Sequence, residues 1–187
     1  MKTFISMLRG INISGHRLIK MDALKALYAE LGFTHIQTYI QSGNVIFKHR
    51  NTDLQEFKKL IADGIREKFG FEVPVIVKEM DELKQIIASN PFLKDSKKDI
   101  SKIYLTFLST VPDSERFCKI GEGQNFEEEY KLTGNSIYIY CPNGYGNTKL
   151  STNFLEGKLK LSATSRNWKT TLELMRIAEE ISAKPSD

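Results

Sequence analysis

The chain has 187 residues, of which 41% are hydrophobic and 27% are charged, and this composition excludes a disordered chain. No apolar stretch approaches the ~20 residues that a membrane-spanning helix needs. The apolar stretch at the N-terminus is too short for a signal peptide, so we expect a cytoplasmic protein. The formal net charge of +4 is too small to predict a dedicated nucleic-acid surface.

The first half of the chain alternates strand and helix patterns. Apolar residues at helical spacing indicate helices that stop at Gly32 and Gly70, and a Ser-Gly-Asn turn joins two strands into a hairpin. The predicted elements are a strand over residues 3–8, a helix over 21–31, strands over 36–41 and 45–47, a helix over 54–69 and a strand over 73–77. This β-α-β-β-α-β order is that of the split βαβ, or ferredoxin-like, unit.

The second half follows after a short helix and a charged connection. Its predicted elements are a helix over residues 81–89, the connection over 94–102, a strand over 103–109, a short helix over 113–119, strands over 129–132 and 137–141, a helix over 150–159, a short strand over 161–163 and a closing helix over 167–181. The hairpin again follows a strand and a helix.

The two halves resemble each other in sequence. Residues 39–47 (YIQSGNVIF) align with residues 130–138 (YKLTGNSIY), and residues 4–8 (FISML) align with 104–108 (YLTFL). Hairpins reuse Gly-Asn turns for steric reasons, so convergence is the alternative explanation. Because the flanking aliphatic and aromatic positions also agree, we predict an α+β fold of two ferredoxin-like subdomains related by duplication. The predicted division is 1–80 for the first half, 81–102 for the helix and connection, and 103–187 for the second half with the C-terminal helix.

Several segments together resemble a known family. They are residues 8–12 (LRGIN), 32–34 (GFT), 38–47 (TYIQSGNVIF), 90–92 (NPF), 149–150 (KL) and 164–170 (TSRNWKT), in that order. This set is similar to an uncharacterised bacterial family, the domain of unknown function numbered 1697. The resemblance covers nearly the whole chain. It implies paired ferredoxin-like α+β subdomains, and it implies no established activity.

Polar residues cluster at the predicted loops and helix starts. Loops with glycine, such as residues 143–147, expose backbone N–H groups, and an arginine at a helix start can form a two-pronged contact with a phosphate or carboxylate. We therefore expect a small anionic or phosphorylated ligand to bind in a cleft between the two halves. The predicted ligand-binding residues are Arg9, Asn12, Gln41, Ser42, Asn44, Lys149, Arg166, Asn167 and Lys169.

These residues also have a purely structural interpretation. Asn44 and Asn135 would hold turns, Asn167 would cap the last helix, and the arginines would pair with acids. In that case the polar segments need not meet at one place.

No pattern assigns catalytic residues, and an enzymatic role stays open. Residues 144–149 lack the P-loop spacing, no GxGxxG segment is present, and Ser42 does not lie in a GxSxG segment. Neither Cys118 nor Cys141 belongs to a CxxC pair, and the histidines are far apart, so we expect no metal and no cofactor.

The alternative function is a non-catalytic module that binds RNA or a protein through an exposed sheet face. Phe4 and Phe47 lie on strands that carry base-stacking aromatics in RNA-recognition motifs, and Tyr138 and Tyr140 share one face of the second hairpin. The RNP1 pattern is absent around residues 45–47, however, and an aromatic residue in a strand usually packs in the core.

Overall fold

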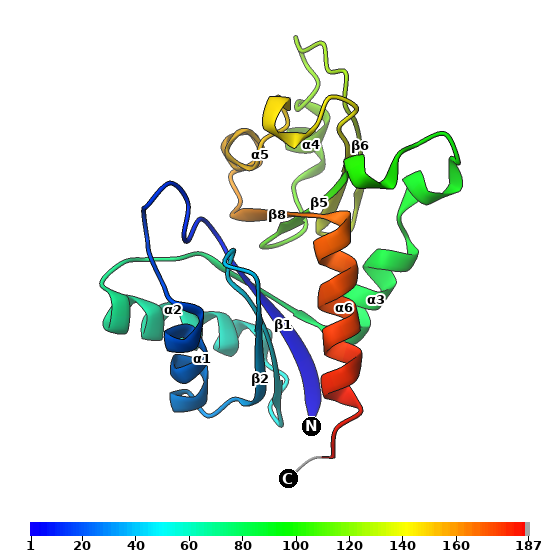
Figure 1. The fold of residues 1–187 in the computed structure, drawn as a ribbon. Helices are drawn as coiled ribbons and strands as arrows, with labels where there is room; N and C mark the ends of the chain where they lie inside the picture. Colours follow the sequence, from blue (N-terminus) through cyan, green and yellow to red (C-terminus); the bar gives the residue numbers. More distant parts are fainter. Residues whose placement is uncertain (186–187) are drawn as a thin grey trace. The chain divides into compact units, whose positions relative to one another are not determined.

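The computed structural model describes residues 1–185 and shows a mixed α/β protein (Figure 1). This part of the chain contains two four-stranded antiparallel sheets and six α-helices. It divides into two compact units: the first unit holds residues 1–85 together with the described residues from Glu173 onward, and the second unit holds residues 86–172. Within residues 1–185, no helix is both long and apolar enough to cross a bilayer.

The first unit is a sheet covered on one face by two helices. Its elements are β1 (Lys2–Leu8), α1 (Met21–Glu30), β2 (Thr34–Tyr39), β3 (Asn44–His49), α2 (Leu54–Phe69) and β4 (Val75–Glu79). The strand order is β2-β3-β1-β4, and every neighbouring pair is antiparallel. The element order β-α-β-β-α-β is the one that the sequence predicts, although β4 begins two residues later than the predicted strand.

Aromatic residues fill the core of the first unit. Phe4 and Phe47 are cross-strand neighbours in β1 and β3, and Phe57 of α2 packs edge-on against Phe4 with ring centroids 5.0 Å apart. Helix α2 begins where the side chain of Asp53 accepts hydrogen bonds from two backbone N–H groups, and it ends at Gly70 in the left-handed conformation. Figure 1 shows α1 and α2 side by side against the sheet.

The central strands are buried on both faces. Successive residues of a strand point to opposite faces, and both Phe4 and Ile5 of β1 are fully buried. The same is true of Ile46 and Phe47 in β3. The first sheet therefore offers no open central face.

The second unit repeats this order. Its elements are β5 (Ile103–Leu108), α4 (Ser114–Cys118), β6 (Glu129–Thr133), β7 (Ser136–Tyr140), a 3₁₀ turn η3 (Tyr145–Asn147), α5 (Thr152–Leu159) and β8 (Ala163–Asn167). The strand order is β6-β7-β5-β8, again antiparallel throughout. Two further 3₁₀ turns, η1 (Pro91–Lys94) and η2 (Ile100–Lys102), precede β5.

A helix follows the last strand of each sheet. Helix α3 (Met80–Ala88) follows β4, and its last residues belong to the second unit, where Tyr138 donates a hydrogen bond of 2.7 Å to the carbonyl of Ile86. Helix α6 (Trp168–Ser182) follows β8, and its residues from Glu173 onward belong to the first unit. The first unit is therefore completed by a helical segment that is remote from its strands in the sequence.

The last strand differs from the prediction. The sequence predicts a short strand over 161–163, whereas β8 runs from Ala163 to Asn167. Residues 164–166 are polar, so no hydrophobic alternation marks them, and their strand conformation follows from pairing with β5, in which Leu105 lies opposite Arg166. This extension places Arg166 on a strand.

Candidate functional site

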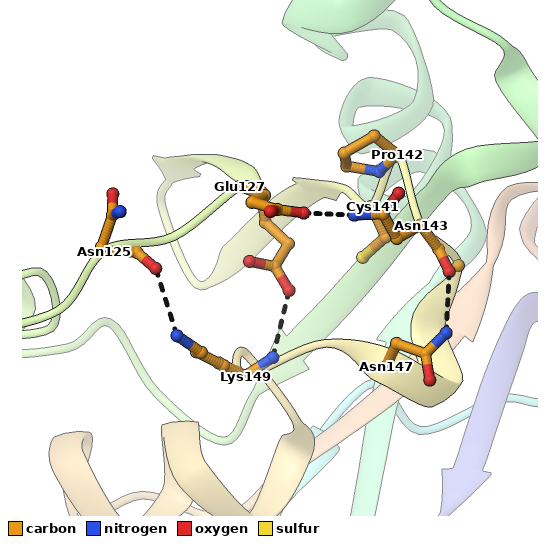
Figure 2. A pocket seen from close by; sticks show the side chains of 9 residues that line it. Asn125, Glu127, Cys141, Pro142, Asn143, Asn147 and Lys149 are labelled. Carbon is orange, nitrogen blue, oxygen red and sulfur yellow. Dashed lines mark hydrogen bonds between the residues drawn. The ribbon is translucent and has the colours of Figure 1, made fainter.

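A polar cavity of about 480 Å³ lies in the second unit (Figure 2). It is formed by the segment before β6 and by the segment that leads from β7 to α5. Its lining residues are Asn125, Glu127, Glu128, Cys141, Pro142, Asn143, Gly144, Asn147 and Lys149.

The loop after β7 holds its shape through backbone hydrogen bonds. The N–H of Cys141 donates to the carbonyl of Lys102 over 2.9 Å, and the N–H of Gly144 donates to the carbonyl of Cys141 over 3.0 Å. Gly144 has a φ of +82°, a conformation that glycine adopts without steric cost. The side chain of Asn147 then donates to the carbonyl of Asn143 over 3.1 Å, so one wall of the cavity is pre-organised.

Both carboxylates of the cavity accept hydrogen bonds from its own lining. The side-chain amide of Asn143 donates to Glu127, and the backbone N–H of Lys149 donates to Glu128 over 3.0 Å. Burial opposes ionisation of Glu128, but hydrogen bonds from Thr148 and from backbone N–H groups outweigh it, so the pKa of this carboxyl lies below its usual value. Glu128 is therefore ionised at neutral pH.

Lys149 supplies the positive charge of the cavity. Its ammonium group donates to the backbone carbonyl of Asn125 over 3.3 Å, as Figure 2 shows. Within residues 1–185, no carboxylate forms an ion pair with it, and the side chain is exposed. The ammonium group thus keeps donor capacity for a ligand.

Cys141 lies at the inner wall of the cavity and is buried. Burial raises the pKa of its thiol to about 11, although Thr148 hydrogen bonds to it and offsets part of the effect. The thiol is therefore protonated at neutral pH and is a poor nucleophile. No cluster of His, Cys, Asp and Glu that could hold a metal ion occurs among the described residues.

The predicted residues of the first unit make hydrogen bonds within or next to their own loops. The side chain of Asn12 donates to the carbonyl of Gln41 over 2.8 Å, and the side chain of Asn44 donates to the hydroxyl of Ser42 over 2.9 Å. Arg9 directly follows β1, and its N–H donates to the carbonyl of Pro74. The Asn44 amide holds its turn, as the structural interpretation expects, and the Asn12 amide joins its loop to this turn, a role that the sequence does not predict.

The predicted residues around β8 and α6 also have local roles. Arg166 is only 8% exposed and donates to the hydroxyl of Thr164 over 2.7 Å, on a strand rather than at the expected helix start. The side chain of Asn167 accepts from the N–H of Thr170 over 2.7 Å and so caps α6. Lys169 is exposed on the first turn of α6. Of all the residues predicted to bind a ligand, only Lys149 lines the cavity, and the meeting of the other groups at one ligand stays a prediction.

Sequence reasoning missed most of the lining. Glu127 and Glu128 fall in an acidic run that indicates a solvated strand end, and Asn125 lies in a segment without a clear pattern. Asn143 and Asn147 belong to the glycine-rich segment before Lys149, which was the one available signal.

Comparison with known proteins gives a family and a fold. Residues 1–138 match the model of a family described as a protein of unknown function, DUF1697. A solved structure, the conserved bacterial protein SP0830 from Streptococcus pneumoniae, is similar with a TM-score of 0.76 and 17% sequence identity, covering 95% of this chain and 98% of that chain. No curated protein matches the chain. At this identity the structural likeness establishes the fold alone.

Proposed function

The chain belongs to the DUF1697 family of proteins of unknown function, and we propose that it binds a small ligand with an anionic group, such as a carboxylate or a phosphate, in the cavity of the second unit. The observation that carries this proposal is Lys149, whose exposed ammonium group lies at a cavity wall and has, within residues 1–185, a backbone carbonyl as its partner and no carboxylate.

The size of the cavity suits a small molecule. Its volume of about 480 Å³ falls within the range of about 300–1,000 Å³ that is usual for ligand pockets. The hydrogen bonds of the loop at residues 141–147 fix its wall before any ligand arrives, and this lowers the entropic cost of binding.

The charges narrow the class of ligand. Glu127 and Glu128 face the same cavity as Lys149, so a ligand with several separate anionic groups would be repelled. A ligand that combines one anionic group with amino or hydroxyl donors suits both the ammonium group and the carboxylates, because its donors can hydrogen bond to the carboxylate oxygens. The side-chain amides of Asn143 and Asn147 can hydrogen bond to either donors or acceptors of the ligand. Amino acids and sugar monophosphates have this character.

The alternative function, nucleic-acid binding on an open sheet face, has little physical support. Phe4, Phe47 and Tyr138 are fully buried, so these rings cannot stack on bases without unfolding of the core.

We also propose that residues 1–80 and 103–187 derive from one duplicated ferredoxin-like unit. The sheet orders β2-β3-β1-β4 and β6-β7-β5-β8 correspond strand by strand, and a helix follows the last strand in each case. A hydroxyl side chain also stands at the same place in each first strand, Ser6 in β1 and Thr106 in β5, and each bonds another hydroxyl. Local convergence of hairpin turns would not produce these shared features.

The ligand proposal is tested by thermal-shift measurements against amino acids, sugar monophosphates and nucleotides. A ligand that binds only the native state at about 100 times its Kd stabilises it by about 2.7 kcal/mol, which gives a readily measured rise in Tm. We expect a rise with a ligand of the proposed class, and its loss in Lys149→Met. Lys131→Met, which removes an exposed lysine from β6, is the matched control and should keep the full shift.

No shift with any of these compounds, or an equal shift in Lys149→Met, would contradict the proposal.

A further inference from the structure

A second surface lies in the first unit, where the loop between β1 and α1 contacts the turn between β2 and β3. We call residues 9–20 together with residues 40–43 the loop–turn surface. We propose that the loop–turn surface docks an acidic segment of a partner protein that also carries apolar side chains. This inference is independent of the cavity in the second unit.

Asn12 holds the two parts of the loop–turn surface together. Its side chain donates to the carbonyls of Ile19 and Gln41 over 3.0 and 2.8 Å, and it accepts from the N–H of Ile19 over 2.8 Å. Its own N–H donates to the carbonyl of Arg17, and a β-bridge joins Ile13 to His16. These hydrogen bonds therefore hold the loop between β1 and α1 in a defined conformation.

The backbone of the loop–turn surface is strained. Ile40 has a φ of +48°, which is rare for a β-branched residue because the side chain crowds the backbone. Three further non-glycine residues with positive φ, Asn12, Ser14 and Arg17, lie in the loop. Such conformations are energetically unfavourable, and they are found most often at functional sites such as ligand-binding loops.

This strained backbone presents apolar side chains to solvent. Ile13, Leu18 and Ile40 are 56%, 65% and 48% exposed. Ile13 directly follows Asn12, whereas Leu18 precedes Ile19 and Ile40 precedes Gln41. Because Asn12 is hydrogen bonded to both Ile19 and Gln41, the backbones of the three apolar residues lie in one small region. Exposed apolar groups gathered at one place mark interaction sites.

The charge of the loop–turn surface has one sign. Residues 1–21 and 31–50 contain no aspartate or glutamate. Arg17 and Lys20 are exposed, and among the described residues no carboxylate forms an ion pair with either. Charge complementarity therefore favours an acidic partner.

A protein segment fits these features better than RNA or a membrane does. The exposed apolar groups are aliphatic, whereas single-stranded nucleic acid is held by aromatic stacking. A fluid bilayer adapts to apolar side chains in many positions, so a fixed arrangement of these side chains adds little to membrane binding. A protein partner with a defined surface binds more tightly when the loop is pre-organised by its hydrogen bonds.

An unbiased library of displayed dodecapeptides tests the inference on the full chain. We expect the selected peptides to be rich in aspartate or glutamate with leucine, isoleucine or phenylalanine. Their Kd should rise about tenfold or more for Arg17→Glu/Lys20→Glu and for Ile13→Ser/Leu18→Ser, because these changes remove the charge and the apolar anchors. Lys131→Glu and Val111→Ser are the matched controls, since Val111 is 67% exposed in the second unit, and they should leave the Kd unchanged.

Two further probes separate the other classes of partner. We expect neither an oligouridylate RNA nor vesicles of phosphatidylcholine and phosphatidylserine to bind in a way that Arg17→Glu/Lys20→Glu abolishes. Selection of no acidic peptide, unchanged peptide Kd in both double variants, or residue-specific binding of the RNA or the vesicles would each overturn the inference.

Discussion

The hydroxyl of Ser6 illustrates how single buried polar residues stabilise this protein. It donates to the carbonyl of Val45 over 3.1 Å and lies 2.8 Å from the hydroxyl of Tyr28, with both side chains fully buried. Burial raises the pKa of Tyr28, and the bond to Ser6 offsets part of this rise. Ser6→Ala would leave the Tyr28 hydroxyl without its partner, so we expect a loss of about 1–3 kcal/mol in the free energy of unfolding, measured by urea titration.

Ser136 is the matched control for Ser6. It is also fully buried in a strand, but its hydroxyl has no hydrogen-bond partner among residues 1–185. Ser136→Ala should therefore change the free energy of unfolding by less than about 0.5 kcal/mol or should stabilise the protein. Equal losses in the two variants would show that the Ser6 bond contributes nothing specific.

The two cysteines differ in their accessibility and chemistry. Cys118 is exposed, whereas Cys141 is buried with a thiol pKa of about 11. Because the thiolate is the reactive form, a raised pKa lowers the reactive fraction at pH 8, and this fraction grows as the pH rises toward 11. In native Cys118→Ser protein we expect slow alkylation of Cys141 by iodoacetamide at pH 8, with a rate that increases steeply up to about pH 11.

Alkylation is followed by mass spectrometry, with Cys141→Ser as the companion variant that reports Cys118 alone. Rapid labelling of native Cys141 at pH 8, at the rate seen in denatured protein, would contradict the burial and the raised pKa.

At the scale of elements, Lys48 fixes the end of α6. This lysine of β3 is 2% exposed, and its ammonium group donates to the carbonyls of Ser182 and Lys184 over 3.3 and 2.6 Å. A cation at a helix C-terminus satisfies carbonyls that have no helical partner and interacts favourably with the helix dipole. Lys48→Met should lower the free energy of unfolding by about 1–3 kcal/mol.

The control for Lys48 is Lys68, whose ammonium group pairs with the exposed Glu30 on the surface. Lys68→Met should cost no more than about 1 kcal/mol, because exposed ion pairs contribute little. If urea titration gave the same small loss for both variants, the capping role of Lys48 would be wrong.

The two hairpin turns differ in how closely they approach the rest of their unit. Gly43 and Gly134 occupy aligned turns and both have positive φ, at +74° and +56°. A Cβ at Gly43 would lie 2.7 Å from side-chain atoms of Leu8 and Ile11, whereas a Cβ at Gly134 would meet nothing within 4 Å. Gly134→Ala should cost about 1–2 kcal/mol for its backbone conformation alone. Gly43→Ala should cost about 1–3 kcal/mol more, because neighbouring side chains must move.

The stabilities of the two glycine variants are compared by thermal unfolding. A Gly43→Ala variant as stable as Gly134→Ala would show that the turn is not packed against Leu8 and Ile11.

Element patterns explain which parts of the fold the sequence could predict. The helices over 54–69 and 167–181 carry regular apolar spacing and a glycine or capping residue, and the structure places α2 and α6 within one residue of these bounds. Strand β8 has no such pattern, because its residues 163–167 (ATSRN) are held by pairing with β5 and not by a hydrophobic face. The misplaced strand end is also the reason why Arg166 was expected at a helix start.

At the scale of the whole molecule, the sequence could predict the order of the elements in each unit but not that the end of α6 belongs to the first unit. The hairpin patterns at residues 39–47 and 130–138 each predict a pair of strands, whereas no local pattern indicates that the described residues from Glu173 onward join the first unit. The cavity could not be predicted from the sequence either, because its lining comes from separate segments. Asn125 and Lys149 are 24 residues apart, and only the tertiary fold brings the carbonyl of one to the ammonium group of the other.

An NMR titration of uniformly ¹⁵N-labelled protein examines the proposed ligand site directly, because every backbone amide reports at once. With a compound selected by thermal shift, we predict saturable shifts that are largest at Asn143, Gly144, Asn147 and Lys149, and their loss in Lys149→Met but not in Lys131→Met. Saturable shifts confined to amides outside the cavity lining, or unchanged shifts in Lys149→Met, would contradict the assignment of this cavity as the ligand site.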